Sequence, residues 1–310
     1  MKFQIVKTDN KARAGLITLN NNVVETPTFM PVATRGAIKS TPHEYLDRTS
    51  ILLANAYHLH LRPGPEIINE HGGLHKFMGW NKLILTDSGG FQAWSLPTKL
   101  YDDGVEFKNV YDGSYFKLTP QESIRTQNLL GSDIAMIFDC LISVEKPDDE
   151  QKKAIEITKK WASIAKKTHN NSLQSLFGIV QGGLNLKLRE DSAKSMIELD
   201  FDGYAIGGLA IGESRQERKS VVEYLSNVLP ADKPRYVIQQ NPFVIHPQTT
   251  KHQQKPCAYH IGARSGATLH HNRIIKTSHV ATSLQKCGYV LRVLHHAIMV
   301  LNESDFSAFR

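Results

Sequence analysis

A short apolar run in this sequence ends in a string of six residues, Asp87–Gln92, that could do chemistry. The string consists of an acid, a hydroxyl, two glycines, an aromatic ring and an amide. We interpret Lys82–Leu85 as a buried strand and Asp87–Gln92 as the loop at its C-terminal end. Asp87 can exchange a proton, paired glycines let backbone approach a ligand closely, and Phe91 can stack on a flat ring. The string predicts a pocket for a planar, hydrogen-bonding molecule such as a nucleobase, although a Ser-Gly-Gly string taken alone suits an ordinary turn equally well.

The same pattern recurs along the chain, because other short apolar runs also end in a polar or glycine group. These groups are Asn55, Asp139, Gln181 and Gly208. A helix-like segment follows each run, and this alternation is typical of a parallel sheet covered by helices. The expected strands are Ile51–Ala54, Lys82–Leu85, Ile134–Phe138, Phe177–Val180, Tyr204–Ile206 and Arg235–Ile238.

The expected helices carry recognisable ends. Thr41 and Thr119 each open a Thr-Pro-x-Glu string, in which the hydroxyl can accept from an early helical N–H group. Gly131 suits a helix end, and a polar insert around Asp112 and Gly113 reads as a hairpin. Longer helices are expected over Asp148–His169, Leu184–Leu199 and Ser214–Leu229.

Two α/β folds fit this pattern. A barrel of eight β/α units and an open doubly wound sheet both carry their sites at the C-terminal ends of strands. Periodicity alone does not choose between them. The sequence holds no glycine-rich dinucleotide fingerprint or phosphate loop that would favour the open sheet.

Composition is that of an ordinary globular protein. The chain has 310 residues, 41% hydrophobic and 22% charged, enough for one large core or two smaller ones. It contains no run of 18 apolar residues and no signal-peptide pattern, so we expect a cytoplasmic location and no membrane association. Cys140, Cys257 and Cys287 are not closely spaced, so they support neither a disulfide framework nor a zinc site.

The net charge of +7 is concentrated near the C-terminus. Residues 1–236 carry 29 basic and 28 acidic side chains, whereas residues 237–310 carry eight and two. The β/α pattern fades at the same point. We therefore expect residues 237–310 to be a divergent basic tail and not the continuation of the preceding pattern. RNA binding by this tail is an alternative interpretation of the charge.

Residues from about Thr26 to Tyr236 resemble the tRNA-guanine transglycosylases, the bacterial queuine tRNA-ribosyltransferases. The resemblance covers about two-thirds of the chain and rests on many long strings in order. They are Thr26–Val32, Tyr57–Leu59, Leu61–Gly64, Gly73–Met78, Leu85–Gln92, Leu130–Ile134, Leu176–Gly183, Phe201–Glu213 and Lys233–Tyr236.

The resemblance implies a TIM (β/α)8 barrel and a base-exchange reaction. Guanine at the anticodon wobble position of tRNA is replaced by a 7-deazaguanine on the path to queuosine. An aspartate attacks the ribose, as in a retaining glycosidase, and the target base must leave the stack. The implied partners are tRNA and guanine or a 7-deazaguanine base.

The residue roles that the resemblance implies begin with the string after the second expected strand. Asp87 matches the general acid/base of the family, which also contacts the bound base. Ser88, Gly89 and Gly90 match the loop at the base, and Phe91 takes the position of the ring that stacks on it.

Further matches lie at the later strand ends. Asp139 matches the carboxylate that reads the guanine edge, and Gln181 matches the amide on the same base. Gly208 matches a backbone contact with Leu209 beside it, and Ile238 stands where the family has a methionine.

The sequence also departs from the family pattern. The glutamate that the family places between the equivalents of Asp139 and Cys140 is missing. After Tyr236 neither the Phe-Asp-Cys motif with the nucleophilic aspartate nor the zinc subdomain is legible. We therefore identify no nucleophile and expect no metal cofactor. The family commonly dimerises through its zinc region, so the expectation of a homodimer is weakened here.

Two function classes follow for this chain. Residues 1–236 are expected to form the transglycosylase-like barrel segment, and residues 237–310 to replace the last barrel units and the zinc subdomain. The chain is then either an active base-exchange enzyme or a catalytically inactive family member. An inactive member would be a frameshifted or decayed product, or a non-catalytic subunit that binds a base or RNA.

Overall fold

The structure is a computed structural model, and it describes residues 1–9, 12–238 and 298–299. All of these residues belong to one compact unit. The expected domain boundary after residue 236 stays a prediction. The remaining residues of the predicted tail, which include Cys257 and Cys287, lie outside the described residues.

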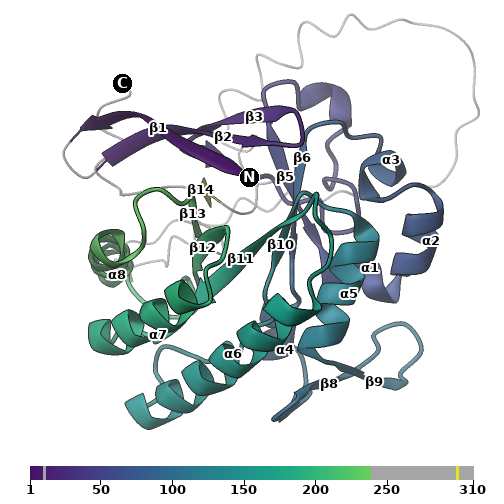
Figure 1. Cartoon of the computed structure of the whole chain (residues 1–310). Helices are drawn as coiled ribbons and strands as arrows, with labels where there is room; N and C mark the ends of the chain where they lie inside the picture. Colours follow the sequence, from purple (N-terminus) through teal and green to yellow (C-terminus); the bar gives the residue numbers. More distant parts are fainter. Residues whose placement is uncertain (10–11, 239–297, 300–310) are drawn as a thin grey trace, which may run out of the picture. The chain divides into compact units, whose positions relative to one another are not determined.

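A curved eight-stranded sheet forms the centre of this unit (Figure 1). Its strands follow the order β4-β14-β13-β12-β11-β10-β6-β5. The strands from β5 to β13 pair in parallel, and β14 is antiparallel to both of its neighbours. The bounds are β4 Thr28–Phe29, β5 Ile51–Asn55, β6 Leu83–Asp87, β10 Ile134–Met136, β11 Ser175–Val180, β12 Gly203–Ile206, β13 Arg235–Val237 and β14 Ile298–Met299.

The two edges of this sheet meet, so the sheet closes into a barrel. Val32, just beyond β4, forms a parallel bridge with Leu53 of β5. Two backbone hydrogen bonds flank it, from the Ala33 N–H to the Leu53 carbonyl at 2.7 Å and from the Leu53 N–H to the Pro31 carbonyl at 3.0 Å. Closure removes unpaired sheet edges. It also decides for the barrel against the open sheet, a choice that periodicity had left open.

The strand count expected from the sequence was too low. All six expected strands exist, but β4 is a seventh that runs in the same direction, and its two residues are too few to show a period. The antiparallel β14 takes the eighth position. At this position the barrel departs from the regular arrangement of eight parallel strands.

Most barrel strands are buried on both faces, which explains their continuous apolar runs. Every residue of β5, β10 and β11 is buried. Alternation of side chains across the sheet therefore places apolar residues both inside the barrel and under the helices. The result is a rigid frame whose polar strand-end residues lie at one end of the barrel.

Helices cover the outside of the sheet (Figure 1). Their bounds are α1 Ala56–Leu61, α2 Pro65–Glu70, α3 Leu74–Met78, α4 Gly90–Ser95, α5 Pro120–Leu130, α6 Asp148–Thr168, α7 Leu186–Glu198 and α8 Arg215–Val228, with a 3-10 turn at His43–Tyr45. The Thr119 side chain accepts from the Glu122 N–H, and Gly131 ends α5 in a left-handed conformation, as predicted. The helix start predicted at Thr41 is wrong, because only the short 3-10 turn forms there and no side chain caps it.

Two antiparallel sheets accompany the barrel. One is the N-terminal sheet of β1 Lys2–Asp9, β2 Ala12–Leu19 and β3 Asn22–Thr26, which the sequence analysis did not identify. The other consists of β7 Thr98–Tyr101, β8 Gly104–Lys108 and β9 Tyr115–Leu118. It contains the predicted hairpin and one additional strand, and it leads into α5 beside the C-terminal end of β6.

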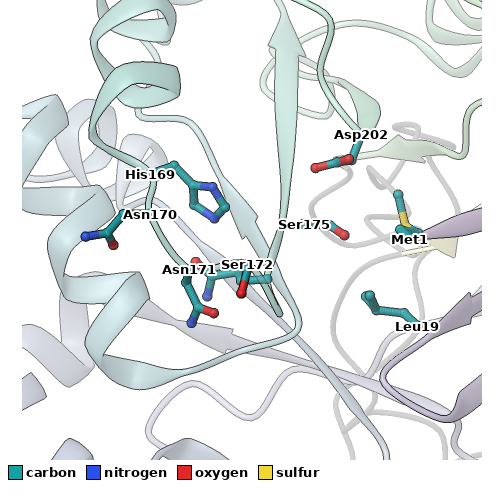
Figure 2. A pocket seen from close by; sticks show the side chains of 9 residues that line it. Met1, Leu19, His169, Asn170, Asn171, Ser172, Ser175 and Asp202 are labelled. Atoms are coloured by element: carbon teal, nitrogen blue, oxygen red, sulfur yellow. The ribbon is translucent and has the colours of Figure 1, made fainter.

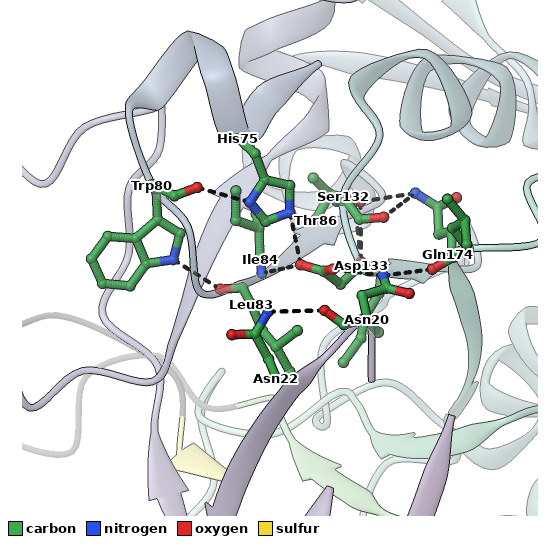
Figure 3. Close-up of polar contacts among 12 residues, drawn as sticks. Asn20, Asn22, His75, Trp80, Leu83, Ile84, Thr86, Ser132, Asp133 and Gln174 are labelled. Carbon is green, nitrogen blue, oxygen red and sulfur yellow. Dashed lines mark hydrogen bonds and ion pairs between the residues drawn. The ribbon is translucent and has the colours of Figure 1, made fainter. Parts of the chain in front are cut away.

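The N-terminal end of the barrel is held together by a buried carboxylate (Figure 3). Asp133 accepts from the Ile84 N–H at 2.8 Å and from the Asn20 side chain at 2.8 Å. The His75 Nε2 atom lies 2.9 Å from the same carboxylate, and its Nδ1 atom lies 2.9 Å from the Trp80 carbonyl. This network joins the β2–β3 turn, α3 and the barrel strands, away from the predicted site.

None of the helices in the described part of the chain is both long and apolar enough to cross a membrane.

Candidate active site at the strand C-terminal ends

Asp87 is the last residue of β6, and its carboxylate is fixed by the neighbouring β5–α1 junction. Asn55 and Asp87 are register partners at the ends of β5 and β6. The Asn55 Nδ2 atom donates to Asp87 Oδ2 at 2.6 Å, and the Ala56 N–H donates to Oδ1 at 3.1 Å. Asn55 in turn caps α1 by accepting from the His58 N–H. The carboxylate is thereby oriented before any ligand binds.

The environment of Asp87 suits proton transfer. Burial raises the pKa of its carboxyl to about 7, and the Asp139 charge adds to this shift. The N–H groups of Ala56 and Gly89 and the Asn55 amide oppose the shift because they stabilise the anion. A carboxyl with a pKa near neutrality can both donate and accept a proton at physiological pH, which is what a general acid/base requires.

The residues after Asp87 bring backbone close to a second carboxylate. A side chain at Gly90 would place its Cβ 2.1 Å from Asp139 Oδ1, so only glycine fits there. Gly89 has a φ of +90°, a left-handed conformation that favours glycine. Ser88 is buried, and its carbonyl accepts from the Ser123 hydroxyl at 2.9 Å. The packing of this site therefore explains why a serine and two glycines stand at these positions.

The loop predicted over Asp87–Gln92 is corrected by the structure, because helix α4 already begins at Gly90. Phe91 consequently lies on the first turn of a helix, where its ring is partly buried. The Phe91 and Trp94 ring centroids are 5.6 Å apart. The glycines made this stretch look like a turn, yet they form the tight entry into a short helix.

Asp139 and Gln181 form a direct pair. Asp139 lies three residues beyond β10 and is 6% exposed, and Gln181 immediately follows β11. The Gln181 Nε2 atom donates to Asp139 Oδ2 at 2.5 Å. Burial raises the pKa of Asp139 to about 6, and the Gln181 hydrogen bond opposes that shift. Asp139 is therefore largely ionised at neutral pH and can accept N–H groups from a ligand.

Gly208 and Leu209 complete the predicted set at the end of β12. Gly208 has a φ of +64°, and a Cβ there would lie 2.4 Å from Gln181 Oε1. Leu209 is buried in the barrel core. Ile238, just beyond β13, is partly buried against that core, and its N–H donates to the Ile206 carbonyl at 3.1 Å. Gln181 is thus confined between Asp139 and the glycine backbone.

A buried arginine that the sequence analysis missed supports this end of the barrel. Arg189 of α7 is 0% exposed, and none of its hydrogen bonds goes to a carboxylate. Its guanidinium donates to the carbonyls of Val180 at 2.9 Å, Gly183 at 2.8 Å and Gly207 at 2.6 Å. Burial lowers the pKa of Arg189 to about 9. Its position four residues before buried Ala193 on the inner face of α7 was the available signal.

The predicted site residues therefore lie in one connected group. Asn55 contacts Asp87, the Gly90 backbone lies against Asp139, and Asp139 contacts Gln181, which lies against Gly208. Phe91 and Leu209 are adjacent to this group in sequence, and both are at least partly buried. The arrangement combines a buried acid, a partly buried acid, an amide and close backbone. Such a set can bind a planar heterocycle and exchange a proton with it.

A hollow of about 370 Å³ lies at the opposite end of the barrel (Figure 2). It is lined by polar residues of the α6–β11 loop, including His169 and Asn171, together with Leu19 and Asp202. Ser175, which begins β11, also lines it, whereas the predicted site follows Val180 at the other end of that strand. This hollow is therefore separate from the carboxylate site. Within residues 1–9, 12–238 and 298–299, no three His, Cys, Asp or Glu side chains gather as a metal ion would require.

Comparisons with known proteins place most of the chain in one family. A family model described as Queuine tRNA-ribosyltransferase matches residues 8–245. A protein of that name from Caldanaerobacter subterraneus subsp. tengcongensis is 47% identical over 245 residues, covering 77% of this chain and 65% of the relative. Relatives of the same name from Acinetobacter baumannii and Thioalkalivibrio sulfidiphilus are 46% and 45% identical, with the same coverage of both chains. The chain thus spans about 65% of the length of these relatives. With its strand-end carboxylates and this match over most of its length, the chain belongs to the queuine tRNA-ribosyltransferase family.

Proposed function

We propose that this protein exchanges guanine at the wobble position of tRNA for a 7-deazaguanine base in queuosine biosynthesis. The observation that carries the proposal is the presence of two carboxylates in one site, Asp139 buried and Asp87 partly buried, each held by different partners. Asp87 is held by Asn55 and the start of α1, and Asp139 is held by Gln181. Family membership, and the relatives' name, support the same reaction.

Asp139 and Gln181 would recognise the base. Guanine and 7-deazaguanine present adjacent N–H donors on one edge and a carbonyl beside them. An ionised Asp139 can accept these donors, and the Gln181 amide can meet the carbonyl. Adenine lacks that donor pair and would leave the buried Asp139 carboxylate without donors from the ligand, at a cost of about 1–3 kcal/mol or more. The site therefore discriminates between purines by unmet hydrogen bonds.

Asp87 would move the proton in both half-reactions. When the glycosidic bond of the target nucleotide breaks, the departing guanine gains a proton from Asp87. When the incoming 7-deazaguanine attacks the ribose, Asp87 takes a proton back from it. A pKa near 7 suits both directions. As guanine leaves, a nucleophilic carboxylate must form a bond to the ribose anomeric carbon, and the incoming base later breaks that bond. We assign no carboxylate of the described residues to this role.

The proposal is tested by measuring base binding and base exchange separately. Guanine binding is followed by calorimetry, and exchange by incorporation of radiolabelled guanine into tRNA. We expect the wild-type chain to do both. The Asp87→Asn variant should retain guanine binding within about tenfold and lose exchange by at least about 100-fold, since positioned acid/base groups contribute 10²–10⁴-fold.

A matched control is Asp149→Asn, which removes an exposed carboxylate on the first turn of α6. It should change neither binding nor exchange. Guanine binding without exchange in the wild-type chain would favour the inactive alternative and refute the proposed activity. Exchange that persists in Asp87→Asn would show that another group moves the proton.

A further inference from the structure

Two arginines lie over one tyrosine ring near the end of the barrel that carries the candidate active site. The Arg62 guanidinium lies 4.1 Å from the centroid of the Tyr111 ring, and the Arg35 guanidinium lies 5.9 Å from it. Both arginines are exposed, and the tyrosine is partly buried. Neither guanidinium forms an ion pair with a carboxylate of the described residues. This arrangement exposes two guanidinium groups, neither of which is paired with a described carboxylate, next to an aromatic ring.

The cluster is anchored to the same elements as Asp87. The Ala56 N–H, which begins α1, donates to Asp87, and the Arg62 N–H ends that helix by donating to the His58 carbonyl. The six residues of α1 separate these two points by about 9 Å. Arg35 follows Thr34, whose carbonyl accepts from the Asn55 N–H at 3.3 Å. The cluster therefore lies next to the site where the ribose of a target nucleotide would be held.

Buried polar atoms around the cluster have no hydrogen-bond partner among the described residues. They are the hydroxyls of Tyr57 and Tyr111 and the His58 Nδ1 atom. Tyr57 is only 1% exposed, so its unmade hydrogen bond is costly. The Tyr111 charge contributes to the raised pKa of Tyr57, after burial, and Arg35 contributes to the lowered pKa of His58, also after burial. The Tyr57 and His58 ring centroids are 5.2 Å apart, so these two unpaired groups are neighbours, and the third unpaired atom belongs to Tyr111 itself.

One nearby acid does not neutralise the cluster. The pKa of Asp112 is lowered chiefly by hydrogen bonds from Ser114, and Arg62 is the weakest of the causes. The Asp112 carboxylate accepts from both the hydroxyl and the N–H group of Ser114. Arg62 therefore remains available to an external anion.

We propose that Arg35, Arg62 and Tyr111 form a subsite for the ribose-phosphate backbone of RNA beside the target nucleotide. Guanidinium groups bind phosphate oxygens through paired N–H donors. The unpaired hydroxyls and imidazole nitrogen match the ribose hydroxyls, which both donate and accept. A backbone contact next to a flipped base would position the strand without reading its sequence. The inference rests on the proposed function for the identity of its ligand.

The test uses the full chain and a fluorescent anticodon stem-loop RNA with guanine at the wobble position. RNA affinity is measured by anisotropy at several salt concentrations, and guanine affinity by calorimetry. The double variant Arg35→Gln/Arg62→Gln should bind RNA about 10–100-fold more weakly. Loss of two phosphate contacts should also reduce the salt slope of the logarithm of Kd by about 1.4. Guanine affinity should stay within about twofold, which also shows that the variant is folded.

Two comparison variants make the result specific. Lys152→Gln/Lys153→Gln removes the same charge from the exposed face of α6 and should change RNA affinity less than about threefold. Arg35→Lys/Arg62→Lys should keep the salt slope but lose part of the affinity, because lysine lacks the planar fork. Equal losses of RNA affinity in the arginine and lysine double variants that carry glutamine would overturn the subsite. Unchanged RNA affinity in Arg35→Gln/Arg62→Gln, or no RNA binding by the wild-type chain, would overturn it as well. RNA binding that depends on the arginine pair without any guanine binding would instead refute the base pocket and leave the subsite standing.

Discussion

The Gln181 amide donates a 2.5 Å hydrogen bond to Asp139, and this contact joins the ends of two barrel strands. Gln181 follows β11, and Asp139 follows β10. The contact orients the carboxylate and holds the amide against Gly208. A base that enters the site therefore meets groups whose positions are already determined, which lowers the ordering cost of binding.

Asp139→Asn should weaken guanine binding by about 10–100-fold. The change replaces a charged acceptor with an amide that presents N–H donors to the donors of the base, and hydrogen bonds to charged groups contribute about 1.5–3 kcal/mol. Calorimetry measures the loss. Asn171→Asp, on the exposed loop at the other end of the barrel, is a control that should leave binding unchanged. Equal guanine affinity in Asp139→Asn and wild type would contradict the assigned role.

Gly90→Ala should abolish guanine binding, because its Cβ would lie 2.1 Å from Asp139 Oδ1 and must displace that carboxylate. Gly79→Ala is the matched control. Its added Cβ meets nothing within 4 Å, and only the φ of +65° is strained. It should cost about 1–2 kcal/mol in the free energy of unfolding while guanine still binds. The two variants are compared by calorimetry and urea unfolding, and normal binding in Gly90→Ala would show that Asp139 does not need its observed position.

Guanine binding should strengthen as pH rises from 5 to 7. Asp139 has a pKa of about 6 and accepts donors only when it is ionised, so its contribution grows through that range. Exchange should then decline above about pH 7, where Asp87 loses the proton that, in the proposed reaction, it would give to the departing base. Asp87 and Asp139 interact, so the pH profile reports two apparent pKa values that belong to the pair. Calorimetry measures the rise in guanine affinity, and exchange rates at the same pH values measure the decline in activity. Guanine affinity that does not change with pH in the wild-type chain would reject the role of Asp139.

The His75–Asp133 contact should make stability depend on pH. Burial lowers the pKa of His75, but the hydrogen bond and charge of Asp133 and the Trp80 carbonyl outweigh it and raise the pKa above its ordinary 6.5. The stabilisation is therefore full below pH 6.5 and is lost as pH rises through the folded-state pKa. The difference in unfolding free energy between wild type and His75→Gln should shrink over that range. A constant difference from pH 5 to 9 would contradict a charged pair.

Elemental analysis of the purified chain should find no stoichiometric zinc. The three cysteines are too widely spaced in sequence for the close thiolate cluster of a structural zinc site. The measurement is made on protein purified without chelators and repeated after dialysis against zinc. One tightly bound zinc per chain would show that this expectation is wrong.

The strand-end pattern was readable from the sequence because its physics is local. A buried strand needs a continuous apolar run, and a polar residue where the run stops identifies its exposed end. Asp87, Asp139, Gln181 and Gly208 were placed at one end of a sheet in this way, and the structure brings them together. The capping string at Thr119 was readable for the same reason, since the accepting hydroxyl and the Glu122 N–H that donates to it lie three residues apart.

Only the tertiary structure decided how these ends meet. Closure depends on Val32 bridging to Leu53, and this short contact has no periodicity. Arg189 became important through carbonyls that two separate segments bring to it, Val180 and Gly183 at the end of β11 and Gly207 at the end of β12. At Thr41 the local signal fails, because its capping string is followed only by a short 3-10 turn and not by the predicted helix. Local sequence determines which segments form strands and helices, whereas contacts between distant segments determine barrel closure, the carboxylate pair and its supporting cation.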